Sequence, residues 1–123
     1  MSLSSSQKKT LRRIAHHLDA VVQVGDQAIT EGVIQETDRA LRDHELIKVR
    51  VNSGEREDRN QACEALAKSC EAEIVQKIGK VAVLYRSNPK ADPKLSNLHR
   101  FAGVKINNLH SKYIVIFRNQ ALG

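Results

Sequence analysis

Aromatic residues are scarce in this chain of 123 residues, at 3% of the sequence, and tryptophan is absent. Few aromatics argue against a surface that stacks several bases on aromatic rings, as some RNA-binding sheets do. Long apolar runs are also missing, so no segment of about 18 apolar residues predicts a transmembrane helix. The polar N-terminus, MSLSSSQKKT, lacks the apolar stretch of a secretory signal. The hydrophobic share of 41% still suffices for one aliphatic core in a single domain.

Cysteine is nearly absent as well, with only Cys63 and Cys70. Seven positions along a helix correspond to a rise of about 10 Å, which is too far for a disulfide. Reduced thiols of this kind favour a cytoplasmic protein. The sequence contains no CxxC, HExxH, GxSxG or phosphate-binding loop, and its five histidines are dispersed. We therefore expect no enzyme activity, no metal site and no cofactor.

Charge is the most informative property that the chain does have, because it is unevenly distributed. Residues 1–18 contain four bases and no acid, whereas residues 19–73 contain 13 acids and 7 bases. Residues 74–123 contain nine bases and one acid. Such segregation favours a polyanionic partner bound on one side of the molecule. A solvated surface with a basic tail is the alternative.

Hydrophobic periodicity predicts an α/β domain with the element order α-β-α-β-α-β-β. The expected fold is a two-layer sandwich of helices on a small mixed four-stranded sheet. The first helix follows possible serine caps and has an apolar face formed by Leu11, Ile14, Ala15 and Leu18. Further helices are expected at about 30–43 and 56–70. Strands are expected at 20–24, 46–51, 73–79 and 80–86.

Three segments of the chain resemble one known family. They read LRRIAHHLDAVVQVG, ITEGVIQETDRALRDHELIKVRV and AEIVQKIGKVAVLYR, and HELIKV and IGKVAVLYR are the most specific parts. They are similar to the CRM domain, the chloroplast RNA splicing and ribosome maturation family, whose bacterial single-domain members are the YhbY-like proteins. The resemblance covers about residues 8–87. It implies an RNA-binding domain folded like the C-terminal domain of translation initiation factor three.

The resemblance also sets the expected domain bounds and partner. We expect an RNA-binding domain at 1–87 and a basic, partly flexible C-terminal extension at 88–123, with a possible short strand at 113–117. Bacterial family members are associated with precursors of the large ribosomal subunit. The expected partner is therefore ribosomal RNA in such particles, with neither a membrane nor a small-molecule substrate involved. A protein-interaction adaptor on the pre-ribosome, using the acidic surface, is the alternative function.

Family members carry a GxxG loop between the first strand and the second helix. Here the corresponding residues are Gly25, Asp26, Gln27 and Ala28, so the first glycine is kept and the second is replaced. Glycine lets the backbone approach nucleic acid closely, whereas the Ala28 methyl and the Asp26 charge oppose this. Either the loop binds RNA weakly, or its contacts have moved to neighbouring cations, or it is an ordinary turn.

Phosphate and sugar contacts should dominate binding to such a surface. The candidate RNA-binding residues are Lys8, Lys9, Arg12, Arg13, His16, Gly25, Asp26, Gln27, Ala28, Lys48, Arg50, Lys77, Lys80 and Arg86.

The replacement Asp26→Lys tests whether the loop lies on the RNA path. It exchanges a repulsive charge for an attractive one, so RNA binding should tighten by about 1 kcal/mol at low salt. The gain should shrink as salt rises. Titration of a pre-ribosomal RNA fragment at two salt concentrations measures it, and equal affinities of parent and variant at low salt would identify an ordinary turn.

Overall fold

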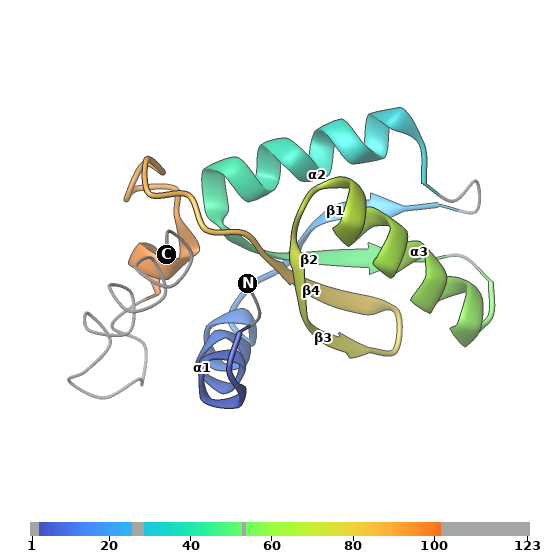
Figure 1. The fold of residues 1–123 in the computed structure, drawn as a ribbon, viewed down its shortest axis with the longest axis horizontal. Coiled ribbons are helices and arrows are strands. Elements are labelled where there is room, and N and C mark those ends of the chain that lie inside the picture. The colour runs from blue at the N-terminus through green and yellow to red at the C-terminus, as the bar shows by residue number, and fades with distance from the viewer. Residues whose placement is uncertain (1–2, 26–28, 53, 102–123) are drawn as a thin grey trace.

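Residues 3–25, 29–52 and 54–101 are described by the computed structural model of the chain (Figure 1). The helices are α1 Ser5–Ala15, α2 Glu31–His44, α3 Arg56–Ser69 and α4 Asn97–Arg100. The strands are β1 Ala20–Val24, β2 Leu46–Val51, β3 Glu73–Ile78 and β4 Val81–Tyr85. The first seven elements confirm the predicted order. The short helix α4 was not expected, and the possible strand at 113–117 lies outside the described residues.

Local sequence signals account for where the elements begin and turn. Ser4 and Gln7 form a capping box at the start of α1, in which the Gln7 N–H donates to Ser4 Oγ at 3.2 Å. Thr30 caps α2 by accepting the Val33 N–H at 3.2 Å. Gly79 turns β3 into β4 with a φ of 56°, a left-handed conformation that glycine adopts easily.

The four strands form one mixed sheet in the order β1-β2-β4-β3. β1 and β2 are parallel, and α2 makes the crossover that a parallel pair requires. β4 is antiparallel to both β2 and β3, so the last strand lies inside the sheet. This topology confirms the predicted mixed four-stranded sheet.

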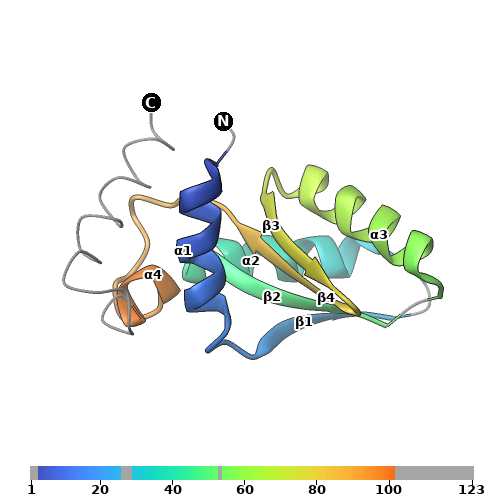
Figure 2. The same ribbon diagram turned by 90° about the horizontal axis from the view of Figure 1, so that it is seen from below.

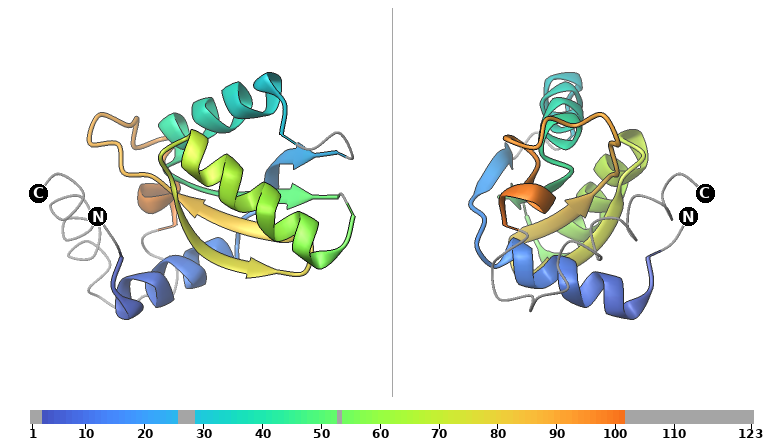
Figure 3. Two further views of the ribbon diagram at one scale, coloured as in Figure 1. Left: turned by 45° about the vertical axis from the view of Figure 1, so that its right-hand side comes forward. Right: turned by 90° about the vertical axis from the view of Figure 1, so that its left-hand side faces the viewer.

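Helices cover the two faces of the sheet unequally (Figures 2 and 3). α2 and α3 pack on one face, where the main core includes Leu41, Val49 and Leu66. α1 lies across the strands on the opposite face and shares a second core with Leu98 of α4. The predicted sandwich therefore has a partial third layer. No helix among the described residues is long and apolar enough to cross a membrane.

A buried carboxylate ties the segment after β4 to the rest of the domain. Glu45 is fully buried, and it accepts hydrogen bonds from the Asn88 N–H at 2.7 Å and from the Ser96 hydroxyl. Close by, Asn97 Nδ2 donates to the Leu46 carbonyl at 2.7 Å. These two bonds of the Glu45 carboxylate give partners to the partly buried Asn88 N–H and the buried Ser96 hydroxyl. Residues 88–101 are thus packed on the domain, although they lie beyond the domain end expected at 87.

Replacing Glu45 by alanine should destabilise the fold, because it leaves the Asn88 N–H and the Ser96 hydroxyl without their acceptor. Each orphaned buried group costs about 1–3 kcal/mol. Urea denaturation measures the loss. Glu71→Ala is the matched control, since Glu71 is exposed and has a similar left-handed backbone, with φ 54° against 63° for Glu45. Equal losses in the two variants would contradict the role assigned to the carboxylate.

Candidate nucleic-acid interface

The sheet face beneath α1 is organised in rows that run across the strands. Side chains alternate between faces along a strand, so Leu46, Lys48 and Arg50 of β2 all lie on the α1 side. Lys48 stands opposite Val83 of β4, and Arg50 stands opposite Val81. The sequence predicted this alternation along β2. The structure adds the cross-strand neighbours, which could not be read from the chain order.

α1 covers only part of this face. Its buried residues Leu11, Ile14 and Ala15 pack with Leu46 and Tyr85 in the second core. Farther along β2, Lys48 is half-buried and Arg50 is exposed. A hollow of about 220 Å³ lies where the helix meets the uncovered sheet. We call it the α1 groove, and its lining residues are Arg12, Ala15, His16, Lys48, Gln76, Ile78, Val81 and Val83.

The α1 groove combines a cationic rim with an apolar floor. Arg12 comes from α1, His16 caps the C-terminal end of that helix, and Lys48 comes from β2, so the fold brings three predicted site residues together. The floor includes Ile78, whose exposed fraction of 64% is high for an isoleucine. An exposed apolar surface between cations suits a ligand that has both phosphates and flat apolar faces.

The cations in the groove and beside it keep their charge available for a ligand. Within the described residues, Arg12, Lys48 and Arg50 form no ion pair. Lys8 lies four residues before Arg12 and Arg12 four before His16, which places the three along one edge of α1. Lys9 and Arg13 are exposed on the neighbouring edge. The first turn of α1 contains no acidic residue, although an acidic side chain there would interact favourably with the positive end of the helix dipole.

Two predicted site residues lie away from the groove and are paired with acids. Lys77 points to the α3 side, where its Nζ is 3.5 Å from Glu64. The Arg86 guanidinium lies 2.7 Å from the Asp38 carboxylate and donates to the Cys70 carbonyl at 2.8 Å. The structure therefore does not bring either cation together with the α1 set. Their proposed contacts with RNA remain predictions.

Gly25 and Lys80 lie at the same end of the sheet, on either side of the end of β2. The Val51 N–H donates to the Lys80 carbonyl, and the Asn52 N–H donates to the carbonyl of Val24, the residue before Gly25. A Cβ added at Gly25 would meet nothing within 4 Å, and the residue has no left-handed φ. The fold itself therefore does not require glycine there. Asp26, Gln27 and Ala28 lie outside the described residues.

The two cysteines lie in the core. Cys63 and Cys70 are buried free thiols in the core between α3 and the sheet. Burial raises the pKa of both thiols, which makes the reactive thiolate rarer at neutral pH. Across residues 3–25, 29–52 and 54–101, no three histidine, cysteine or acidic side chains gather into a possible metal site.

Reasoning from charge alone missed the uncharged half of the groove. Gln76, Ile78 and Val81 were read only as strand residues, yet they form its floor with Val83. An irregularity between Ile74 and Gln76 shifts the register of β3 against β4, so strict alternation from the start of β3 would misplace Gln76. The one signal for this apolar floor in the sequence was Ile78, an apolar residue directly before the turn residue Gly79.

Taken together, the fold and the groove define a small α/β domain with a basic, partly open sheet face, as in proteins that bind nucleic acid backbones. The sequence model of the CRS1 / YhbY (CRM) domain matches residues 3–86. The chain therefore belongs to the CRM domain family, which confirms the resemblance drawn from its sequence segments.

Relatives and a solved structure agree with this membership. A protein of Pseudomonas aeruginosa named "Probable RNA-binding protein" is 47% identical over 104 residues, 85% of this chain and 100% of the relative. A Haemophilus influenzae protein named "RNA-binding protein" is 43% identical, covering 76% of this chain and 95% of its own. The solution structure of a hypothetical protein from Staphylococcus aureus has a TM-score of 0.66 at 35% identity, covering 74% of this chain and 95% of that one.

Proposed function

We propose that this protein is a non-catalytic, cytoplasmic RNA-binding protein that acts on ribosomal RNA during assembly of the large ribosomal subunit. The α1 groove is the centre of the binding surface. Arg12, Lys48 and Arg50 contact phosphates, and the apolar floor accommodates ribose or base surface. The observation that carries the proposal is that Arg12, Lys48 and Arg50, at or beside the uncovered part of the sheet, form no ion pair within residues 3–25, 29–52 and 54–101.

The geometry supports backbone contacts more than sequence readout. In the groove, the Lys48 ammonium group supplies a point charge and the Arg12 guanidinium supplies paired N–H donors, and both suit phosphate oxygens. Among the residues that the structure describes, its lining contains no tyrosine, phenylalanine or tryptophan, so extensive base stacking is not expected in the groove itself. The names of the relatives support RNA as the polyanion. Ribosomal RNA and large-subunit precursors are the partner that the family resemblance implies.

The acidic face is a weaker candidate for the functional surface. The adaptor hypothesis relied on Glu36, Asp38, Asp43, Glu57, Asp58 and Glu64. In the structure, Asp38 is paired with Arg86, and Glu64 is paired with Lys77. Asp58 accepts the Glu55 N–H at 3.4 Å near the start of α3. Asp38, Asp58 and Glu64 thus already have local partners, whereas Arg12 and Lys48 form no ion pair with any residue that the structure describes.

The double variant Arg12→Gln with Lys48→Gln should weaken binding to a pre-ribosomal RNA fragment about a hundredfold or more. Two charge-assisted contacts are lost, each worth about 1.5–3 kcal/mol, and about 1.4 kcal/mol corresponds to tenfold. The slope of log affinity against log salt should fall by roughly one per lost phosphate contact. Filter binding or fluorescence anisotropy at several salt concentrations measures both quantities.

Arg56→Gln with Lys68→Gln is the matched control. It removes the same two residue types from α3, where both side chains are exposed on the opposite side of the sheet. The control should keep nearly the parent's affinity. If the two double variants lose affinity equally, net charge and not the α1 groove determines binding, and the proposed surface is wrong.

A further inference from the structure

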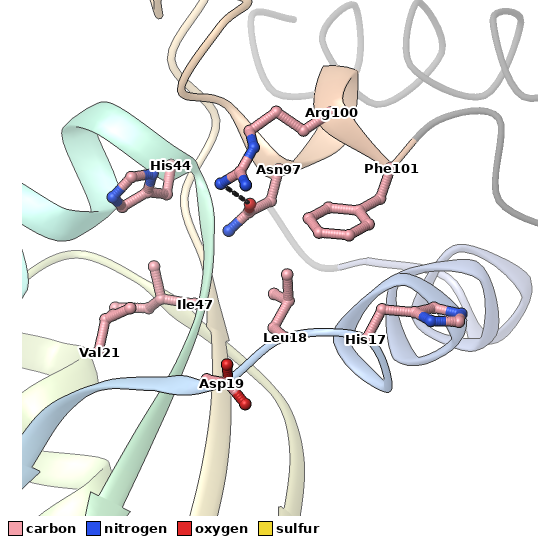
Figure 4. A pocket seen from close by; sticks show the side chains of 9 residues that line it. All are labelled: His17, Leu18, Asp19, Val21, His44, Ile47, Asn97, Arg100 and Phe101. Carbon is pink, nitrogen blue, oxygen red and sulfur yellow. Dashed lines mark hydrogen bonds between the residues drawn. The ribbon is translucent and has the colours of Figure 1, made fainter.

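A second hollow lies at the other side of the end of α1, between the domain and the segment that Glu45 holds in place. It has a volume of about 200 Å³, and Figure 4 shows its lining. We call it the α4 pocket, and its lining residues are His17, Leu18, Asp19, Val21, His44, Ile47, Asn97, Arg100 and Phe101. Three of these belong to residues 97–101, beyond the stretch matched by the family model.

Three flat groups lie along one side of the α4 pocket, namely the rings of His17 and Phe101 and the Arg100 guanidinium, and we call them the pocket wall. The rings of His17 and Phe101 are nearly parallel, with an interplanar angle of 13° and centroids 6.3 Å apart. The Arg100 guanidinium carbon lies 5.3 Å from the centre of the Phe101 ring, and Arg100 also donates to Asn97 Oδ1 at 3.4 Å. Asn97 is itself fixed by its bond to the Leu46 carbonyl. Flat aromatic and guanidinium surfaces held in this way are the groups on which unpaired bases stack.

The remaining lining supplies an apolar floor and hydrogen-bonding groups of both kinds. Leu18, Val21 and Ile47 line the hollow below the wall. His44 Nδ1 lies 2.8 Å from the Leu95 carbonyl, which can only accept, so the Nδ1 carries the proton. His44 Nε2 is left to accept a hydrogen bond from a ligand when the ring is neutral. Asp19 adds a carboxylate acceptor.

This lining fits a nucleobase better than a phosphate. A carboxylate on the rim repels a phosphate, whereas it accepts hydrogen bonds from the ring and amino N–H groups of a base. The volume lies below the range of about 300–1,000 Å³ typical of drug-sized ligands, so the occupant must be small. A nucleobase can pack on the apolar floor, stack on the pocket wall and form hydrogen bonds with the polar groups.

The position of the pocket connects it to the α1 groove. His16 lines the groove and the adjacent His17 lines the pocket, with their rings 5.8 Å apart in an edge-to-face arrangement. A strand whose phosphates follow the groove would therefore reach the pocket at the end of α1. We propose that the α4 pocket takes one unpaired base of the bound RNA, stacked against the wall of His17, Phe101 and Arg100. This inference rests on the proposed RNA binding.

The test compares two RNA probes on the full chain: a short single strand of mixed sequence, and the blunt duplex that it forms with its complement. His17→Ala and Arg100→Gln alter exposed side chains, so neither should disturb folding. Loss of one stacked base costs about 1–3 kcal/mol, so each variant should weaken single-strand binding about fivefold or more. Duplex binding should stay within about twofold of the parent. Lys94→Gln is the charge control, because Lys94 is exposed in the same segment but does not line the pocket.

The outcomes separate this inference from the proposed function. Loss confined to the single strand, with Lys94→Gln close to the parent, supports the base pocket. Unchanged single-strand binding in both variants overturns it. Equal losses on single strand and duplex also overturn it, because they would reflect charge and not an inserted base. If the parent bound neither RNA, the proposed RNA binding itself would be wrong, whereas strong parent binding with unaffected pocket variants would refute the pocket alone.

Discussion

The packing of α1 across one part of the sheet is the constraint on which the proposed binding surface depends. Leu11, Ile14 and Ala15 bury against the strands and fix the helix there. Because the helix lies across the strands, it covers one end of that face and leaves the other end open (Figure 2). Arg12 and His16 then stand at the boundary, next to Lys48. The same packing that stabilises the second core therefore also positions the cations.

The buried carboxylate of Glu45 fixes the segment that follows β4, just as the packing of α1 fixes the helix. By accepting hydrogen bonds from Asn88 and Ser96, it holds the chain against the start of β2. Leu98, fully buried in the second core, adds apolar contact to these polar ones. The α4 pocket exists because this segment is held in place. The Glu45 carboxylate thus contributes both to the stability of the domain and to the pocket proposed to bind a base of the RNA.

Elements with strong periodicity were predictable from the sequence, whereas their lateral relations were not. The faces of α1 and β2 followed from regular apolar spacing, and the cap before α1 followed from its serine residues. α4 was missed because four residues carry too little periodicity to be recognised, and because their burial depends on the distant Glu45. Charge counts likewise gave no sign that Arg86 is paired with Asp38, while Arg12 has no ion pair in the described part of the chain. Those pairings depend on long-range geometry.

The central claim is that RNA lies on the α1 side of the sheet and not on the α2 and α3 side. Nuclear magnetic resonance of the isotope-labelled full chain, titrated with a pre-ribosomal RNA fragment, tests it most directly. The account predicts that the largest amide shift changes occur around Arg12, His16 and Lys48, while the exposed residues of α3 stay nearly unchanged. Shift changes concentrated along α2 and α3, with those around the α1 groove unaffected, would contradict it.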